Sequence, residues 1–290
     1  PAIMLFSLSL NAQDDLMNLL DTAEEPKINY AFATFKSTRI MNGHSIEKMG
    51  PGQLDFRISH RFGRLNSGIY ELFGIDQANI HFGLEYGLTK WLMIGVGRGT
   101  YEKTYDGFAK FSILRQSSGA RVMPVSLSAF TSVAINSLKW EDETVTNYFS
   151  SRLSYVAQLL VARKFSQGLS LQIMPSYVHR NLVATELDPN DLYAIGAGGR
   201  IKITKRISFN AEYYYVANPK DYMSQPVYNP LSVGFDVETG GHVFQIILTN
   251  SVAMIEKGFI GETTGQWTAG DIHLGFNISR VFNLGKKQGL

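Results

Sequence analysis

Residues 77–98, QANIHFGLEYGLTKWLMIGVGR, alternate between apolar side chains and small or polar ones on both sides of a short turn. In the first arm the even positions from 80 to 88 are apolar, while the odd positions carry His81, Gly83, Glu85 and Gly87. Successive side chains of a strand point to opposite faces, so one face of this hairpin is apolar and the other is polar or small. Each arm has about ten residues, which is longer than the usual strand of five or six. Long alternating arms joined by a tight turn are typical of a β-barrel that crosses a lipid bilayer.

The same rhythm recurs along the chain from residue 53 onward. It predicts about twelve strands, near 53–62, 77–88, 91–100, 105–115, 124–136, 148–163, 168–179, 192–203, 206–217, 231–238, 241–250 and 271–282. The fold class is therefore all-β, a single antiparallel up-and-down transmembrane β-barrel. A soluble propeller or sandwich is the alternative, and its strands would be shorter with the apolar face turned inward.

The connections between the predicted strands alternate in length. Short turns fall at 88–90, 165–168, 204–206 and 238–241, whereas longer polar connections fall at 63–76, 137–147, 180–190, 218–230 and 251–270. Two connections depart from this alternation. The connection at 101–104 is short where a long one is expected, and the connection at 116–123 is long where a short one is expected. Outer-membrane barrels have short periplasmic turns and longer extracellular loops. We therefore expect an outer-membrane location, and the even strand count places both termini in the periplasm.

Composition excludes several classes of protein. The formal net charge of the 290 residues is only +2, which gives no reason to expect nucleic acid as a partner. Cysteine is absent, so thiol catalysis and zinc–thiolate sites are excluded. No stretch of eighteen consecutive apolar residues predicts a transmembrane helix.

The chain before the barrel divides into two predicted parts. Residues 1–12 resemble the end of a signal peptide, with cleavage after Ala12. Residues 13–51 form a periplasmic lead-in with a short amphipathic helix over 13–25, and residues 28–51 alternate poorly and could plug the barrel mouth. The barrel then occupies 52–283 and a tail follows over 284–290.

The polar face of the strands predicts the residues that line the lumen. Candidates are Asp55, Arg57, His81, Glu85, Lys110, Arg152, Arg200, Lys202, Glu212, Asp236 and His273. Buried charges need partners, so opposite signs should meet across the lumen. Barrels of eight strands are filled by side chains and those of about sixteen hold channels. A twelve-stranded barrel could therefore be filled by salt bridges or could leave a polar lane for a small solute, and the filled state is the favoured interpretation.

The sequence predicts no catalytic, cofactor or metal site. Ser45 follows His44 and Ser59 precedes His60, but adjacent residues of a strand point to opposite faces and cannot act together. The Gly-x-Ser-x-Gly elbow and the helical histidine pairs of metal sites are also absent. An outer-membrane lipid hydrolase remains an alternative, and it would need a serine, a histidine and an Asn or Asp converging on the lipid-facing rim.

Four motifs carry a resemblance to a known family: TFKSTRI over 34–40, NGHSIE over 42–47, ETGGH over 238–242, and DIHLGFNISRVF over 271–282. Across residues 26–283 the chain resembles an outer-membrane β-barrel family of unknown function from Bacteroidota. The resemblance implies an outer-membrane location and supplies no catalytic residues. The last strand, which ends on Phe282, also looks like the aromatic-ended signal read by the barrel-assembly machinery.

The functional expectation is a non-enzymatic, monomeric outer-membrane barrel that serves passive small-solute transport or envelope structure. Its expected partners are outer-membrane lipid, the barrel-assembly machinery during biogenesis, and small polar solutes, with no cofactor. A second alternative, beside the hydrolase, is an assembly or interaction partner of another envelope protein that uses residues 28–51 as its surface.

Overall fold

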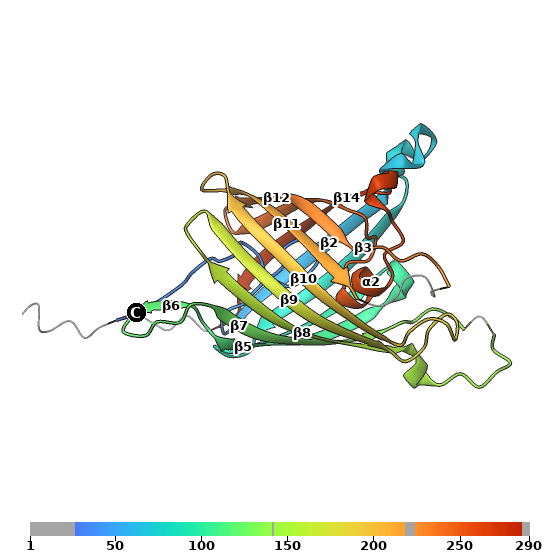
Figure 1. Cartoon of the computed structure of the whole chain (residues 1–290), viewed down its shortest axis with the longest axis horizontal. Coiled ribbons are helices and arrows are strands. Elements are labelled where there is room, and N and C mark those ends of the chain that lie inside the picture. The colour runs from blue at the N-terminus through green and yellow to red at the C-terminus, as the bar shows by residue number, and fades with distance from the viewer. Residues whose placement is uncertain (1–26, 141, 218–223, 286–290) are drawn as a thin grey trace, which may run out of the picture.

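Twelve antiparallel strands close into a barrel in the computed structural model, which describes residues 27–140, 142–217 and 224–285 (Figure 1). Each strand pairs with the next along the chain, apart from a short excursion between β5 and β7, and β14 pairs with β2 to close the ring. The strands are β2 (Gln53–Arg64), β3 (Ala78–Gly87), β4 (Leu92–Gly99), β5 (Tyr105–Leu114), β7 (Ser126–Ile135), β8 (Leu153–Lys164), β9 (Leu169–Arg180), β10 (Asp191–Lys202), β11 (Ile207–Val216), β12 (Leu231–Thr239), β13 (His242–Thr249) and β14 (His273–Asn283). The predicted fold class is confirmed.

The outer surface of this barrel is apolar. Exposed fractions reach 48% for Phe82, 61% for Val96 and 54% for Ile173, while the residues between them in each strand are buried. Exposed large apolar side chains in a continuous band are unfavourable in water and favourable in lipid. In the described part of the chain, no helix is both long and apolar enough to cross a membrane.

Short helical turns and one small sheet complete the described structure. They are β1 (Ile28–Tyr30), which pairs with β6 (Ser117–Gly119), the 3-10 turns η1 (Leu65–Ser67), η2 (Ile69–Gly74), η3 (Tyr101–Lys103), η4 (Phe149–Arg152) and η6 (Trp267–Ala269), and the helix α2 (Glu256–Gly261). The strand predicted from residue 148 begins only at Leu153, because η4 occupies the preceding four residues. The predicted signal-peptide remnant and the helix over 13–25 lie outside the described residues, as does the tail from residue 286.

The barrel has two different ends. Connections 88–91, 115–125, 165–168, 203–206 and 240–241 lie at one end, which we call the short-turn end; 65–77, 100–104, 136–152, 181–190, 217–230 and 250–272 lie at the other, the long-loop end. β2 begins and β14 finishes at the short-turn end, where Leu284 donates its backbone N–H to the Gly52 carbonyl. The small β1–β6 sheet extends from this end (Figure 1).

Candidate functional site: a closed lumen

A hairpin of the N-terminal segment lies inside the barrel. The backbone N–H of Ile40 donates to the Gly43 carbonyl, and that of Ser45 donates to the Thr38 carbonyl. These two bonds define residues 38–45 as a tight hairpin, which we call the inner hairpin. Ile40, Met41 and Ser45 have no exposed surface. The sequence predicts that residues 28–51 lie on the periplasmic side or in the barrel mouth. The inner hairpin of this segment instead lies inside the barrel.

The tip of the inner hairpin is held by one carboxylate of β11. Glu212 accepts the backbone N–H groups of Met41 at 3.2 Å, Asn42 at 2.6 Å and Gly43 at 3.2 Å. The Asn42 side chain also accepts a hydrogen bond from Arg61 at 2.6 Å and donates to the Ser232 hydroxyl at 2.9 Å. A charged acceptor facing several aligned N–H groups makes shorter and stronger hydrogen bonds than a neutral one. Glu212 thus acts as a cradle for the turn.

Wall side chains from several strands satisfy the carbonyls of the same segment. Lys110 of β5 donates to the carbonyls of Ser45 at 2.9 Å and Glu47 at 2.8 Å. Further donors come from β9, β10, β13 and β14: Gln172 to the His44 carbonyl, Arg200 to the Ala33 carbonyl, Gln245 to the Ile40 carbonyl and Asn277 to the Met41 carbonyl, all at 2.8–3.0 Å. The inner hairpin is therefore tied around most of the circumference, although it forms no ladder with any wall strand.

A buried charge cluster joins the hairpin to β2 and β3. Glu85 accepts from the Thr38 hydroxyl at 2.5 Å and lies 3.3 Å from the Arg39 guanidinium and 3.7 Å from that of Arg57. Arg57 also pairs with Asp55 at 2.8 Å. The four charged side chains have exposed fractions of 1–9%, so each depends on the others to offset its desolvation.

The apolar part of the hairpin packs against a cluster on the opposite wall. Phe35 and Ile40 join buried residues of β7 to β11 and of α2, and the His44 ring packs against Phe108 and Phe130 with centroids 4.6 Å and 4.2 Å away. Close approach requires a missing side chain: a Cβ on Gly198 would lie 2.6 Å from the Ile40 side chain. The glycines of β10 relieve crowding inside the barrel, as their place in a strand suggests.

Nine of the eleven predicted lumen residues are buried on the inner wall: Asp55, Arg57, His81, Glu85, Lys110, Arg200, Glu212, Asp236 and His273. Lys202 is half-buried at the short-turn edge. Arg152 is not part of the lumen. It belongs to η4, donates to the Asn136 and Leu138 carbonyls, and stacks over Trp140 at the long-loop end. Arg61, fully buried, was overlooked although its position follows the same alternation.

A second segment, α2, packs into the barrel near the long-loop end (Figure 1). Phe259 and Ile260 of α2 have no exposed surface, and Phe259 packs against Tyr214 with ring centroids 5.1 Å apart. Lys257 pairs with Glu102 of η3 and lies 2.6 Å from Glu262. Burial disfavours the charged lysine, but these two carboxylates outweigh burial and raise the pKa of Lys257. Burial also raises the pKa of Glu262, although Lys257 opposes the shift.

Replacing Lys257 with methionine is expected to loosen α2. Glu102 and Glu262 would then lack their cation, at a cost of about 1–3 kcal/mol to the docked state. Because the pKa of Glu262 is raised by burial, the docked state binds more protons, and docking of the variant weakens as the pH rises above the ordinary glutamate value of about 4.3. The measurement is the hydrogen-exchange protection factor of residues 256–262 in micelles against pH. Equal protection in wild type and variant at neutral pH would mean that Lys257 does not hold α2 in place.

The histidines make no contact that suggests hydrolysis. Within the described residues, imidazole hydrogen bonds join His44 to Arg39, His81 to Asp106, His179 to Asp191 and His273 to the Phe62 carbonyl, and none of these reaches a serine hydroxyl. The His179 and Asp191 side chains lie 2.6 Å apart near the long-loop rim, and Asp191 also accepts a hydrogen bond from the Tyr177 hydroxyl at 2.6 Å. Within the described residues, no three side chains of His, Asp and Glu converge to hold a metal ion.

Twelve closed strands, an apolar outer band and a polar wall define a transmembrane β-barrel, here with its lumen occupied by its own chain. The sequence over residues 35–282 matches the family described as "Membrane bound beta barrel domain (DUF5777)", so the chain belongs to that family of membrane-bound barrels. Barrels of this kind are outer-membrane proteins. The resemblance to a barrel family of unknown function is confirmed, and the Bacteroidota origin stays a prediction.

Several solved structures share a barrel shape with this chain. A KdgM porin has a TM-score of 0.46 and 9% identity, covering 80% of this chain and 99% of its own. The CymD monoaromatic hydrocarbon channel has a TM-score of 0.37 and 10% identity, covering 81% and 89%. LpxR from Salmonella typhimurium has a TM-score of 0.36 and 10% identity, covering 79% and 99%. No curated protein matches the chain significantly in sequence.

Proposed function

We propose that this protein is a non-enzymatic outer-membrane conduit for small polar solutes that is closed at rest by its inner hairpin. The short-turn end, which carries both ends of the barrel sequence, faces the periplasm. The observation that carries the proposal is the match between the wall and the hairpin. Wall groups that hydrogen-bond to the hairpin are charged, amide or hydroxyl side chains, and water can hydrate each of them. Water can therefore take the place of the hairpin along this polar part of the wall, while the apolar cluster of β7 to β11 stays packed against α2.

The opened lane would carry charges of both signs. The hairpin covers four basic groups, Arg57, Arg61, Lys110 and Arg200, and four acidic ones, Asp55, Glu85, Glu212 and Asp236. A wall of mixed sign attracts neither cations nor anions strongly. The solute class that fits is therefore small and polar, with weak selection by charge.

Conductance in planar lipid bilayers tests the proposal. Wild type is expected to be closed for most of the recording, whereas a variant lacking residues 28–48 with strands β2 to β14 intact is expected to conduct continuously. If the deletion variant shows the heat-modifiable gel mobility of a folded barrel and still does not conduct, the protein is not a conduit. A permanently closed barrel that serves envelope structure then becomes the better account, and the packing of α2 into the other end favours it.

Ion selectivity of the opened barrel gives a second test. In the deletion background, Lys110→Glu is expected to shift the reversal potential in a salt gradient toward cations, because it adds two negative units to the lane. Arg152→Glu makes the same charge change at the long-loop end outside the lumen, so its shift should be much smaller. Equal shifts in the two variants would mean that ions do not pass the Lys110 position.

A partner-binding role for residues 28–51 is the second candidate function, and only part of this segment is exposed to a partner. Within 28–51, residues 34–45 are enclosed by the barrel, whereas Ile28, Tyr30 and Phe32 are exposed, with Phe32 at 82%. We infer that any partner of this segment binds residues 28–32 rather than the motifs over 34–40 and 42–47, which the barrel encloses. Substituting these three residues by serine should then remove a co-purifying protein without unfolding the barrel.

A further inference from the structure

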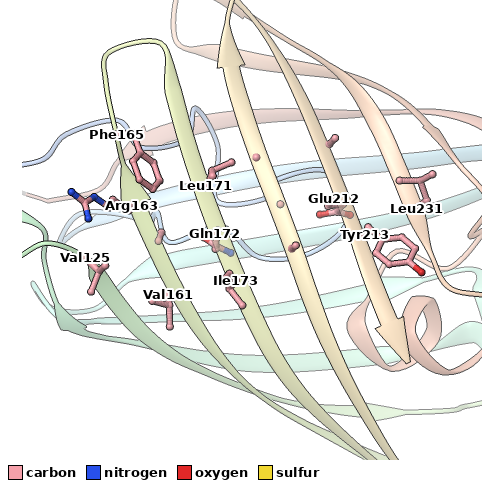
Figure 2. A pocket seen from close by; sticks show the side chains of 15 residues that line it. Val125, Val161, Arg163, Phe165, Leu171, Gln172, Ile173, Glu212, Tyr213 and Leu231 are labelled. Atoms are coloured by element: carbon pink, nitrogen blue, oxygen red, sulfur yellow. The ribbon is translucent and has the colours of Figure 1, made fainter. Parts of the chain in front are cut away.

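A groove runs over the lipid-facing surface of strands β8 to β12 (Figure 2). Its volume is about 510 Å³, and its lining is almost entirely apolar. The floor consists of three small residues that point outward, Ala197 and Gly199 of β10 and Ala211 of β11. Larger outward side chains stand around them: Val161, Leu171, Ile173, Tyr213 and Leu231.

The register of the strands explains why the groove is hollow there. Gly199 pairs with Leu171 on one side and with Ala211 on the other, while Ala197 pairs with Ile173 and Tyr213. Small residues on two adjacent ladders leave a trench between the bulky neighbours. Over β3, β4 and β13 the outer surface instead carries large side chains, such as Phe82, Val96 and Ile246. Lipid-facing strands gain nothing from a trench unless something fills it, because close packing supplies dispersion energy.

The trench crosses the strands and does not follow any one of them. It starts beside Val125 and Phe165 at the short-turn end and reaches Leu231, the first residue of β12 after a long loop. Figure 2 shows these residues at opposite sides of the view, with the strands crossing diagonally between them. From β8 to β12 it crosses four inter-strand spacings, or ~19 Å. Because the strands of such barrels tilt by about 40°, this path spans ~12 Å of bilayer depth. One leaflet of the hydrocarbon core is ~15 Å deep, half of the whole, so an acyl chain of one leaflet fits the trench.

A cation stands at the short-turn end of the trench. Arg163, the last outward residue of β8, is exposed and lies over the Phe165 ring with its guanidinium carbon 5.0 Å from the centroid. Its surroundings carry the same sign, since the stretches 88–91, 115–125, 163–168 and 202–206 contain eight Lys and Arg residues and no acid. An aromatic residue beside a cation at the end of an apolar band marks the level of lipid headgroups.

We propose that this groove binds one glycerophospholipid with an anionic headgroup, with an acyl chain in the trench and the phosphate at Arg163. The lipid comes from the leaflet at the short-turn end. The site lies outside the lumen, so it does not depend on whether the inner hairpin ever leaves. Bound lipid would fill the trench and cover the thin wall formed by Gly199 and Ala197.

Native mass spectrometry of the detergent-purified full chain tests the site. The probes are palmitoyl-oleoyl-phosphatidylglycerol and the matching phosphatidylcholine. Wild type is expected to retain one lipid and to prefer the anionic one. Ala197→Phe and, independently, Ala211→Phe place a ring in the trench and should weaken binding by at least about tenfold. Arg163→Gln should reduce the preference for phosphatidylglycerol by about fivefold, the effect of one cation near a charged lipid.

Two matched controls separate the groove from the general surface. Ala157→Phe puts the same ring on an exposed outward position of β8 that does not line the trench. Arg280→Gln removes a cation that lies over Phe282 at 4.9 Å, the same geometry at the same end of another strand. Both should bind as wild type does. The proposal is overturned if Ala197→Phe binds lipid as well as wild type does, or if the control variants lose as much binding. It is also overturned if wild type forms dimers without lipid and Ala197→Phe does not, because the trench would then bind a second copy of the chain.

Discussion

Replacing Glu85 with alanine is expected to destabilise the folded barrel by about 3–5 kcal/mol, the usual result of removing one partner from a buried ion pair. Glu85 has an exposed fraction of 1% and is the carboxylate that faces both Arg39 and Arg57. Without it, Arg39 loses the carboxylate with which it pairs, Arg57 keeps its ion pair with Asp55, and the Thr38 hydroxyl loses an acceptor. The effect falls on wall and hairpin together, because Arg39 and Thr38 belong to the inner hairpin.

Urea unfolding of the protein in lipid vesicles, followed by tryptophan fluorescence and by heat-modifiable gel mobility, measures the effect. Glu186→Ala removes the same side chain from an exposed position in the loop after β9 and should change the free energy of unfolding by less than about 0.5 kcal/mol. Glu85→Gln retains the shape and an acceptor for Thr38, so it should fall between the two. If Glu85→Ala unfolds at the wild-type urea concentration, the cluster does not hold the hairpin to the wall.

The strands could be predicted from the sequence because the two faces of a barrel strand impose a local alternation of apolar and polar residues. Side chains at 80, 82 and 84 face lipid and must be apolar, while Glu85 faces inward, so alternation alone assigns both faces. The same rule places Lys110 and Glu212 on the inner wall, where the structure has them. The rule fails at Arg152, because the predicted strand extends five residues too far, through the turn η4.

Closure of the lumen by the inner hairpin could not be predicted from such a local pattern. The inner hairpin is held largely through its backbone N–H and C=O groups, which every residue carries, so its sequence need not alternate. The side chains of Thr38, Arg39 and Asn42 add contacts to the wall that only the three-dimensional structure reveals. Its partners on the wall are Lys110, Gln172, Glu212, Gln245 and Asn277, from five different strands. Only the three-dimensional closure of β14 against β2 brings them around one segment. Polar residues on an inner wall therefore indicate a hydrated or filled lumen, and the choice between them lies in contacts far apart along the chain.

Replacing Gly43 with alanine is expected to open the barrel. A Cβ at this position would lie 2.1 Å from the Tyr214 hydroxyl oxygen. The Tyr214 ring cannot retreat, since it is 1% exposed, packs against Phe259, and already lies where a side chain on Gly196 would be. Overpacking of this kind costs about 1–3 kcal/mol, and the hairpin can relieve it only by leaving Glu212. The ratio of closed to open barrels should then fall about 5- to 150-fold.

Two further variants make this expectation specific to the contact between the hairpin and Tyr214. Gly83→Ala adds the same methyl group to the inner wall, where the nearest atom would be 3.7 Å away, and it should conduct as little as wild type. In Gly43→Ala combined with Tyr214→Phe, the clashing oxygen is gone while the ring remains, so the double variant should close again. The open fraction in bilayer recordings distinguishes the outcomes. If the double variant conducts as much as Gly43→Ala, the opening comes from a general loss of packing, and the turn of the inner hairpin against β11 is not what holds the barrel shut.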